Sequence, residues 1–465
     1  METNKTKKNY LNDKNIKKIH FIGIGGSGMC PLANILKSKG YIISGSDNYM
    51  SDTLERLIKM GFSIKINHSK ENVEGTDLVV YSAAIKEDNV ERVAARKLNI
   101  PQIERSDLLG MVCSKYENLI AIAGTHGKTT TTAMITQVLT MCNADPTAII
   151  GGKLPFINGN SRIGKSQNII CEACEYVDTF LKLDPTISVI TNVEADHLDY
   201  FKNLDGVINS FKKFANQTTE LIIANGDDEN SLEVIKDVKT AKVITFGFKN
   251  RNDYHIGKFS EKNGFFESFE VFKGKDLLGE FSLQVPGKHN VYNALAAIAV
   301  ADYLEIEIKN IKEAIKAFSG VHRRFEILCR KDDITIVDDF AHHPTEIENT
   351  LSSAKKMGFK RVIGIFQPHT YSRTAMFLND FAKVLSIADL TIVSEILAVR
   401  EVNSYNIYSE DLVEKIKNGV YLKTFEDIAS YIEKIVKPGD LILTMGGGNV
   451  YECANMLVKK LKNKK

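Results

Sequence analysis

The sequence lacks an apolar run long enough to span a bilayer, and its polar start lacks the hydrophobic segment of a signal peptide. The seven cysteines are odd in number and scattered, which is typical of reduced thiols rather than of a disulfide framework. Net charge is only +2, and the lysine-rich ends read as solvated tails rather than as nucleic-acid arms. We therefore expect a cytoplasmic protein with no nucleic acid and no membrane among its partners.

The sequence also lacks internal repeats and long low-complexity linkers, so its 465 residues must be divided among ordinary folded domains. Apolar content of 43% and charged content of 25% are usual for globular proteins, and the length suggests about three domains. Apolar strand patterns alternate with helical patterns, which predicts α/β domains with parallel sheets. The predicted domains are 1–115, 116–320 and 321–465. The predicted strands are 19–22, 41–43, 77–81, 119–123, 168–171, 187–191, 221–224, 242–246, 335–337, 361–366, 390–394 and 441–444, with β-hairpins in 250–284.

A glycine turn between the strand 119–123 and a threonine-rich helix is the most informative motif. Backbone N–H groups of such a turn converge on an anion, and the helix dipole favours it. Lys128 would reach the outer phosphates of a nucleoside triphosphate, and the Thr129 hydroxyl would bind Mg²⁺. Position 122, where a standard P-loop has its leading glycine, is isoleucine, and a turn that binds nothing is the alternative. The predicted ATP-binding residues here are Gly124, Thr125, His126, Gly127, Lys128, Thr129 and Thr130.

A second glycine loop follows the first predicted strand. Its spacing, Gly23-x-Gly25-x-x-Gly28, matches the dinucleotide fingerprint, and Asp47 stands near the end of the next strand, where a ribose-binding acid would lie. Alone, this pattern suggests an NAD(P)-dependent oxidoreductase. UDP-sugars also carry a pyrophosphate, however, and the glycines do not decide which nucleotide is bound.

Acidic residues follow two strands of the central block. Glu172 and Glu175 come after 168–171, and a run containing His197 comes after 187–191. In a parallel sheet these ends share one edge with Lys128, where carboxylates would hold Mg²⁺. A surface histidine at a helix start is the alternative reading of His197.

The last block places cationic and imidazole groups after its strands. Arginine suits bidentate recognition of phosphate or carboxylate, whereas paired histidines are either acid–base groups or loop caps. The residues concerned are Arg323, Arg324, Asp338, Asp339, His342, His343, His369 and Arg373.

Nine motifs occur in an order that resembles the muramyl ligase family, from about residue 17 to about 450. They are GIGGSGM, GTHGKTTT, EACEY, TNVEADHLDYF, PGKHNVYNALAAIAV, HRRFE, DDFAHHPTEI, FQPHTYSRT and EILAVRE. Single motifs are shared with the wider superfamily that includes folylpolyglutamate synthetases. The combination of the first, seventh and eighth most resembles members that join L-alanine to UDP-N-acetylmuramate.

The resemblance implies a Rossmann-like domain for the UDP-sugar, a central P-loop ATPase-like parallel sheet, and a C-terminal Rossmann-like domain for the amino acid. It also implies binding residues. The UDP-sugar would be held by Gly25, Gly26, Ser27, Gly28, Asp47 and Ser82, and metal ions by Thr129, Glu172 and His197. The adenine would be contacted by His289, Asn290 and Asn293, and the rest of the nucleotide by Arg324 and Asp339. The alanine site would be lined by His342, His369 and Arg373.

The implied reaction is ATP-dependent amide formation through an acyl phosphate, with Mg²⁺, in cytoplasmic peptidoglycan synthesis, by a monomer or homodimer. The alternatives are a ligase adding another amino acid or a recycled peptide, an oxidoreductase, and a nucleotide-dependent switch without catalysis. Three positions depart from the family or are undecided. Phe340 replaces the usual tyrosine, residues 446–449 read Gly-Gly-Gly-Asn in place of Gly-Ala-Gly-Asp, and Lys212 is either a carbamylated lysine or a solvated helix lysine.

Overall fold

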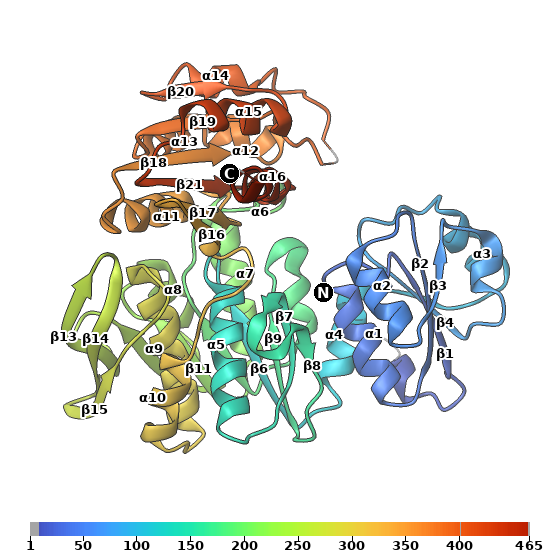
Figure 1. The fold of residues 1–465 in the computed structure, drawn as a ribbon. Coiled ribbons are helices and arrows are strands. Elements are labelled where there is room, and N and C mark those ends of the chain that lie inside the picture. Colours follow the sequence, from blue (N-terminus) through green and yellow to red (C-terminus); the bar gives the residue numbers. More distant parts are fainter. Residues whose placement is uncertain (1–8, 400, 464–465) are drawn as a thin grey trace. The chain divides into compact units, whose positions relative to one another are not determined.

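The computed structural model describes residues 9–399 and 401–463 (Figure 1). These residues divide into two compact units. Unit 1 comprises residues 9–246 with 299–301, and unit 2 comprises residues 247–298 with the described residues from 302 onward. Five of the lysines in the predicted tails (5, 7, 8, 464 and 465), together with residue 400 of EILAVRE, lie outside the described residues.

The first part of unit 1 is a parallel sheet in the order β3-β2-β1-β4-β5. Because β1 pairs in parallel with both β2 and β4, the segments that follow these three strands meet at one sheet edge. The elements are β1 (Lys18–Ile22), α1 (Met29–Ser38), β2 (Ile42–Asp47), α2 (Asp52–Lys59), β3 (Ser63–Ile66), β4 (Leu78–Tyr81), α3 (Val90–Lys97), β5 (Gln102–Glu104) and α4 (Arg105–Cys113).

The second part of unit 1 is a sheet in which β12, β11, β10, β6, β9, β7 and β8 are neighbours in that order. Only the β7–β8 pair is antiparallel. The strands are β6 (Asn118–Ala123), β7 (Thr147–Leu154), β8 (Gly159–Arg162), β9 (Asn168–Glu172), β10 (Ile187–Ile190), β11 (Leu221–Asn225) and β12 (Lys242–Gly247), with helices α5 (Lys128–Met141), η4 (Tyr176–Lys182), α6 (Leu198–Phe201), α7 (Leu204–Gln217) and α8 (Glu229–Ile235).

Unit 2 contains an antiparallel β-meander and a mainly parallel sheet in the order β16-β17-β21-β18-β19-β20. Its elements are β13 (Tyr254–Lys262), β14 (Phe265–Lys273), β15 (Asp276–Phe281), α9 (Lys288–Tyr303), α10 (Ile308–Lys316), β16 (Glu326–Lys331), β17 (Ile334–Asp339), α11 (Pro344–Lys356), β18 (Arg361–Phe366), α12 (Tyr371–Met376), α13 (Leu378–Leu385), β19 (Leu390–Val393), α14 (Ser409–Val413), β20 (Gly419–Tyr421), α15 (Phe425–Ile435), β21 (Asp440–Met445) and α16 (Tyr451–Asn463).

Strand periodicity explains how the parallel sheet of unit 2 buries both faces. Val337 and Leu443 share one apolar core with residues of α11 and α13, whereas Ile336 and Ile442 share another with residues of α15 and α16. Successive strand residues point to opposite faces, so a near-continuous apolar run supplies two cores at once.

All twelve predicted strands are confirmed, and the region 250–284 forms the predicted antiparallel strands. Two strand ends were wrong: β2 continues to Asp47 instead of ending at 43, and β17 includes Asp338 and Asp339 instead of ending at 337. Polar residues continue these strands because they have partners: Asp47 Oδ2 accepts from Gly25 N, and the buried Asp338 accepts from Arg323 Nε. The sequence prediction missed β3, β5, β8, β16 and β20, which are short or polar, and also the longer β7. In the described part of the chain, none of the helices is both long and apolar enough to cross a membrane.

Candidate functional site

The glycine turn after β6 is shaped by its neighbour, the segment after β10. Gly124 has a φ of 142°, and a Cβ added there would lie 1.9 Å from Thr191 Oγ1, so only glycine fits. Asn192 holds the turn from both sides: its carbonyl accepts from Thr125 N at 3.0 Å and its Oδ1 accepts from His126 N at 2.8 Å. The turn is therefore fixed before any ligand binds.

Helix α5 begins at Lys128 directly after Gly127, which has a φ of 82° and offers no side-chain cap. The N–H groups of the first helical turn lack intrahelical partners and carry the positive end of the helix dipole. Thr129 and Thr130 follow in this turn, as the sequence predicts. This is the local geometry of an anion site.

The ammonium group of Lys128 is enclosed by oxygen atoms. Its Nζ donates to Gly124 O at 2.5 Å, to Thr125 O at 3.0 Å and to Glu175 Oε1 at 3.1 Å. Burial by itself lowers the pKa of Lys128, but the carboxylates of Glu175 and Glu172 outweigh burial and raise that pKa above its usual range. Lys128 is therefore a permanent cation at the glycine turn.

Thr129 and Glu172 form a compact group of oxygen donors. Thr129 Oγ1 donates to Glu172 Oε2 at 2.9 Å, and Gly151 N donates to the same oxygen at 2.9 Å. A Cβ at Gly151 would lie 2.3 Å from Glu172 Oε2 and 3.0 Å from Thr129 Oγ1, so a side chain there would displace the Glu172 carboxylate. Hydroxyl and carboxylate oxygens are hard ligands of the kind that Mg²⁺ takes, and the pair fits such an ion.

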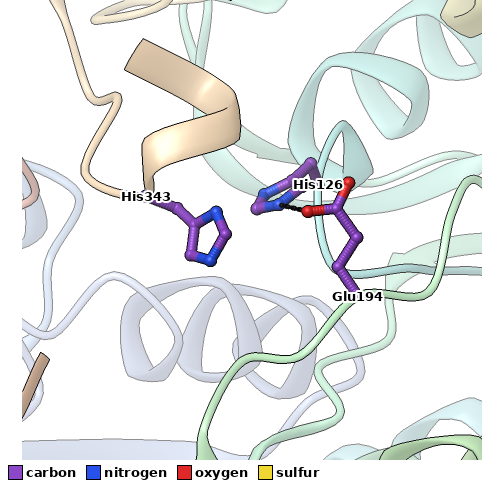
Figure 2. Close-up of side chains that lie close together, drawn as sticks. All are labelled: His126, Glu194 and His343. Carbon is purple, nitrogen blue, oxygen red and sulfur yellow. Dashed lines mark hydrogen bonds and ion pairs between the residues drawn. The ribbon is translucent and has the colours of Figure 1, made fainter. Parts of the chain in front are cut away.

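His126 contacts a second carboxylate, that of Glu194. Figure 2 shows its ring joined to Glu194, with Nε2 and Oε2 3.3 Å apart. The Glu194 backbone N–H also donates to Thr125 Oγ1 at 2.8 Å. This pair fixes the middle of the glycine turn against the segment after β10.

His197 lies just before α6 in a left-handed conformation, with a φ of 54°. Its Nε2 is 3.7 Å from Asp196 Oδ2 and 4.0 Å from Glu175 Oε1. The structure thus brings His197 to Glu175 and Asp196. Lys212, in contrast, lies on α7 and donates to Glu233 Oε1 at 2.5 Å, an ion pair at the surface.

The first glycine loop is tied to the acidic residue that the fingerprint predicts. Gly25 N donates to Asp47 Oδ2 at 3.0 Å, and a Cβ at Gly25 would lie 2.9 Å from that oxygen. Asn160 of β8 donates to Ser27 O at 2.9 Å, and the guanidinium of Arg105 lies beside Gly28, 3.2 Å from a Cβ placed there. A cation therefore accompanies the loop, which the sequence prediction missed.

The remaining UDP-sugar candidates are Gly26 and Ser82. Gly26 lies within the loop turn, where its N–H donates to Gly23 O, and Ser82 follows β4 directly, with its carbonyl accepting from Ile85 N. Since β1, β2 and β4 are parallel, all six candidates follow or end strands at one sheet edge.

In unit 2, the start of α9 carries three of the predicted nucleotide residues. Asn290 Nδ2 donates to Pro286 O at 2.7 Å, and Asn293 Nδ2 donates to Asn290 Oδ1 at 3.1 Å. Burial, opposed by Glu346 and assisted by Arg324, lowers the pKa of His289 to about 4, so its imidazole is neutral at pH 7.

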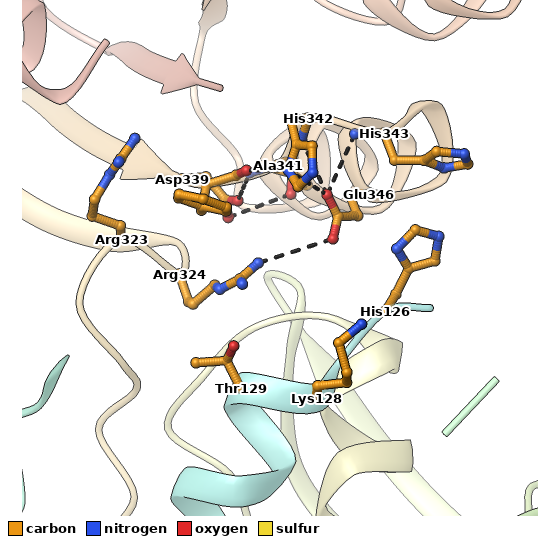
Figure 3. Close-up of polar contacts among 12 residues, drawn as sticks. His126, Lys128, Thr129, Arg323, Arg324, Asp339, Ala341, His342, His343 and Glu346 are labelled. Carbon is orange, nitrogen blue, oxygen red and sulfur yellow. Dashed lines mark hydrogen bonds and ion pairs between the residues drawn. The ribbon is translucent and has the colours of Figure 1, made fainter. Parts of the chain in front are cut away.

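Arg324 and Asp339 belong to the same neighbourhood (Figure 3). Arg324 Nη1 is 4.0 Å from Glu346 Oε1, and its guanidinium lies over the Phe340 ring at 5.1 Å. Asp339 is buried and accepts from Phe325 N at 2.8 Å and from Ala341 N at 2.7 Å. Burial outweighs the charge of Arg324 and raises the pKa of Asp339 to about 6.

The predicted alanine residues occupy adjacent loops because β17, β21 and β18 end in register, with Asp339 beside Met445 and Met445 beside Phe366. The rings of His342 and His369 lie 6.0 Å apart. His342 Nδ1 approaches Phe340 O at 2.9 Å and Glu346 Oε2 at 3.3 Å.

Two further predicted residues differ in role. Arg373 lies on α12 and is half-buried, and its backbone N–H donates to Thr370 Oγ1 at 3.4 Å. His343 is the N-cap of α11, where its Nδ1 accepts from Thr345 N at 3.4 Å. Of the paired histidines, His343 therefore acts as a loop cap.

Arg323 holds the glycine turn that follows β21. Its Nε donates to Asp338 Oδ2, its Nη1 to Gly448 O and its Nη2 to Gly446 O, each at 2.9 Å. The turn lies against His342, since a Cβ at Gly447 would be 3.3 Å from the ring. Asn449, at the unusual last position, accepts from Gln367 Nε2 at 2.9 Å.

The structure thus assembles the predicted residues within each unit and adds several that were not predicted. Lys128, Thr129 and Glu172 come together in unit 1, as do His289, Arg324 and Asp339 in unit 2. The added residues are Arg105, Gly151, Glu194 and Glu346; only the Gly-Gly pair at 151–152, within β7, gave a sequence signal of its own.

Comparison with known proteins gives matches along the whole chain. Three family models match in order: "Mur ligase family, catalytic domain" over residues 18–117, "Mur ligase middle domain" over 122–301, and "Mur ligase, glutamate ligase domain" over 323–448. The UDP-N-acetylmuramate--L-alanine ligase of Caldanaerobacter subterraneus subsp. tengcongensis is 46% identical over 452 residues, which cover 96% of this chain and 98% of the relative.

Two solved structures are similar in fold. The UDP-N-acetylmuramate-alanine ligase MurC from Thermotoga maritima has a TM-score of 0.83 at 30% identity, covering 96% of this chain and 100% of its own. The murein peptide ligase mpl from Psychrobacter arcticus has a TM-score of 0.76 at 25% identity, and the match covers 97% of this chain and 99% of that ligase's chain.

Proposed function

Because this chain belongs to the Mur ligase family, we propose that it joins L-alanine to the lactyl carboxylate of UDP-N-acetylmuramate in an ATP-dependent reaction. The products are UDP-N-acetylmuramoyl-L-alanine, ADP and phosphate, and the reaction belongs to peptidoglycan synthesis in the cytoplasm. The chain acts as a monomer or homodimer.

The observation that carries this proposal is the glycine turn at residues 124–127, which is followed directly by Lys128 at the start of α5. A carboxylate is inert toward amines in water because its oxygen is a poor leaving group. Transfer of the γ-phosphoryl group of ATP to the lactyl carboxylate makes an acyl phosphate, which an amine can attack. Lys128 and the N-terminus of α5 would spread the charge of the transferring group.

Mg²⁺ is part of the proposal. Thr129 and Glu172 would hold it, because their oxygens already lie 2.9 Å apart, with His197 serving a further ion. When bound, the ion neutralises charge on the transferring phosphate. Glu175 keeps Lys128 oriented by its ion pair at 2.9 Å.

The nucleotide and the amino acid would also use unit 2. His289, Asn290 and Asn293 would face the adenine, where a neutral imidazole and two carboxamides offer uncharged donors and acceptors. Arg324 and Asp339 would meet the phosphates and ribose. His342 or His369 would orient or deprotonate the alanine amine, and Arg373 would pair with its carboxylate.

The UDP-sugar would bind at the first glycine loop, through Gly25, Gly26, Ser27, Gly28, Asp47 and Ser82. Arg105 supports this assignment, because a guanidinium beside Gly28 suits a pyrophosphate. The three matched family ranges support domain boundaries near residues 115 and 320.

The test is phosphate release from ATP with UDP-N-acetylmuramate and each of the twenty amino acids in turn. We expect release that depends on the sugar nucleotide and is fastest with L-alanine. Release that needs a peptide instead would favour the activity named for the murein peptide ligase relative. A change in absorbance at 340 nm with NAD(P), or nucleotide binding without product, would contradict the proposal.

A further inference from the structure

Two loops of the proposed phosphate site in unit 1, residues 175–182 with η4 and residues 196–201 with α6, are joined by a crossed pair of tyrosine–aspartate hydrogen bonds. Tyr176 donates its hydroxyl to Asp199 Oδ2 at 3.3 Å, and Tyr200 donates its hydroxyl to Asp178 Oδ2 at 2.8 Å. Each loop supplies one donor and one acceptor. Sliding one loop past the other would therefore break both bonds.

The first of these loops has a backbone that needs such support. Val177 and Asp178 have φ angles of 54° and 56°, inside η4. Left-handed backbone is rare for non-glycine residues and is a genuine outlier for a β-branched one, so surrounding contacts must hold it. Ser210 of α7 adds a hydrogen bond from its hydroxyl to Asp178 Oδ1.

The same loops carry groups of the proposed metal and phosphate site. Glu175, next to Tyr176, pairs with Lys128 at 2.9 Å. The ring of His197 packs on that of Tyr176, with centroids 4.6 Å apart, and its Nε2 is 4.0 Å from Glu175 Oε1. Any shift between the loops therefore moves His197 relative to Glu175.

The tyrosine rings contribute through their hydroxyls more than through burial. Tyr176 and Tyr200 are 41% and 39% exposed, although tyrosines that serve the core are mostly buried. Replacing either with phenylalanine would keep the ring contacts and remove only the hydrogen bond. The phenylalanine variants therefore isolate the crossed bonds.

We propose that Tyr176, Asp178, Asp199 and Tyr200 are positioning residues, whose crossed hydrogen bonds hold His197 and Glu175 in register for binding of the metal–nucleotide complex. This inference rests on the proposed function, because it takes His197 as a metal ligand. None of the four residues needs to touch substrate.

The experiment is calorimetric titration of Mn²⁺ into the full-length protein in the presence of ADP. The Tyr176→Phe/Tyr200→Phe double variant should bind Mn²⁺ about 5- to 20-fold more weakly, as expected for two lost hydrogen bonds. Asp178→Asn, which keeps an acceptor oxygen, should bind more tightly than Asp178→Ala. In turnover assays, the KM for Mg²⁺ should rise while the KM for UDP-N-acetylmuramate stays the same.

The matched control is Tyr421→Phe, which removes the tyrosine–carboxylate hydrogen bond to Glu395 in unit 2. It should leave Mn²⁺ binding unchanged. Unchanged Mn²⁺ affinity in the double variant, or an equal rise in both KM values, would overturn the positioning role alone. If the unaltered protein with ADP does not bind Mn²⁺, the proposed metal site itself is wrong.

Discussion

The polar clusters of the two units are built from similar side chains, yet ion pairing keeps Lys128 of unit 1 charged, whereas burial shifts the pKa values of His289 and Asp339 of unit 2 toward their neutral forms. In unit 1, Lys128 is largely enclosed, but Glu175 and Glu172 raise its pKa despite burial. In unit 2, burial outweighs the neighbouring charges, so the pKa of Asp339 rises to about 6 and that of His289 falls to about 4.

The pKa shifts of the two units differ because, among the described residues, Lys128 contacts an oppositely charged group directly and His289 does not. Lys128 contacts Glu175 at hydrogen-bond distance, whereas His289 is influenced by Glu346 and Arg324 with opposite effects that partly cancel. A fixed cation suits the phosphates of ATP, and a neutral imidazole suits a base. Each cluster therefore suits a different kind of ligand group.

Removing the cation of unit 1 should have the largest effect. Lys128→Ala deletes the charge that, in the proposed function, would stabilise the transferring phosphoryl group, so we expect the rate of amide formation to fall by roughly 10³-fold or more. Binding of UDP-N-acetylmuramate, measured by calorimetry, should persist because the first glycine loop is unchanged. Undiminished turnover would refute the assignment of Lys128.

Within unit 2, Arg323 offers a test of a charge that is fully paired. Arg323→Ala would leave Asp338, which is 1% exposed, without its cation and release the turn at Gly446 and Gly448. We expect a loss of about 3 kcal/mol in the free energy of unfolding, measured with urea, and a higher KM for L-alanine.

Arg361→Ala is the matched control for Arg323. Arg361 pairs with Asp440 at 2.6 Å in the same sheet and also donates to Ile435 O. We expect this variant to lose about 2 kcal/mol of stability with no change in the KM for L-alanine. Equal KM values in both variants would show that the glycine turn does not shape the alanine site.

The pH dependence of stability should separate the two groups whose pKa values are shifted by burial. The folded protein resists protonation of His289, so its contribution to stability falls by roughly 3 kcal/mol as pH drops from 6.5 to about 4. Asp339 acts oppositely, because the folded protein binds a proton at this carboxyl more readily than the unfolded chain does. Its contribution to stability is full below pH 3.8 and is lost as the pH rises through about 6. This loss is also roughly 3 kcal/mol.

Urea unfolding across this pH range would measure both slopes. Relative to the unaltered protein, His289→Gln should gain stability as the pH falls, and Asp339→Asn should gain stability as the pH rises. The lost hydrogen bond of Asp339→Asn shifts its curve by a constant amount and leaves the slope diagnostic. Parallel curves for all three proteins would contradict the comparison.

The smallest effect is expected at Lys212. Lys212→Ala removes a surface ion pair with Glu233, so stability should change by less than about 0.5 kcal/mol and turnover should not change. A large loss of turnover that bicarbonate influences would revive the carbamylated-lysine interpretation.

The sequence by itself determined the twelve predicted strands, the glycine turns and the polar groups placed after them. Local patterns suffice for these because an apolar β-branched run, a glycine and a helix start are each recognisable within a few residues. Parallel pairing then puts strand ends together, which is why Lys128 and Glu172, or Asp339 and His342, could be grouped before their contacts were known.

The tertiary structure alone decided which groups pair and which stay charged. Glu175 pairs with Lys128, which lies 47 positions away in the sequence, and Arg323 bonds to Gly448, which lies 125 positions away. Asp338 and Asp339 were expected in a loop, but they form the end of β17. Burial and long-range pairing set the pKa of each group, and long-range pairing stabilises polar residues inside strands. Neither depends on neighbours along the chain, so no local pattern records them.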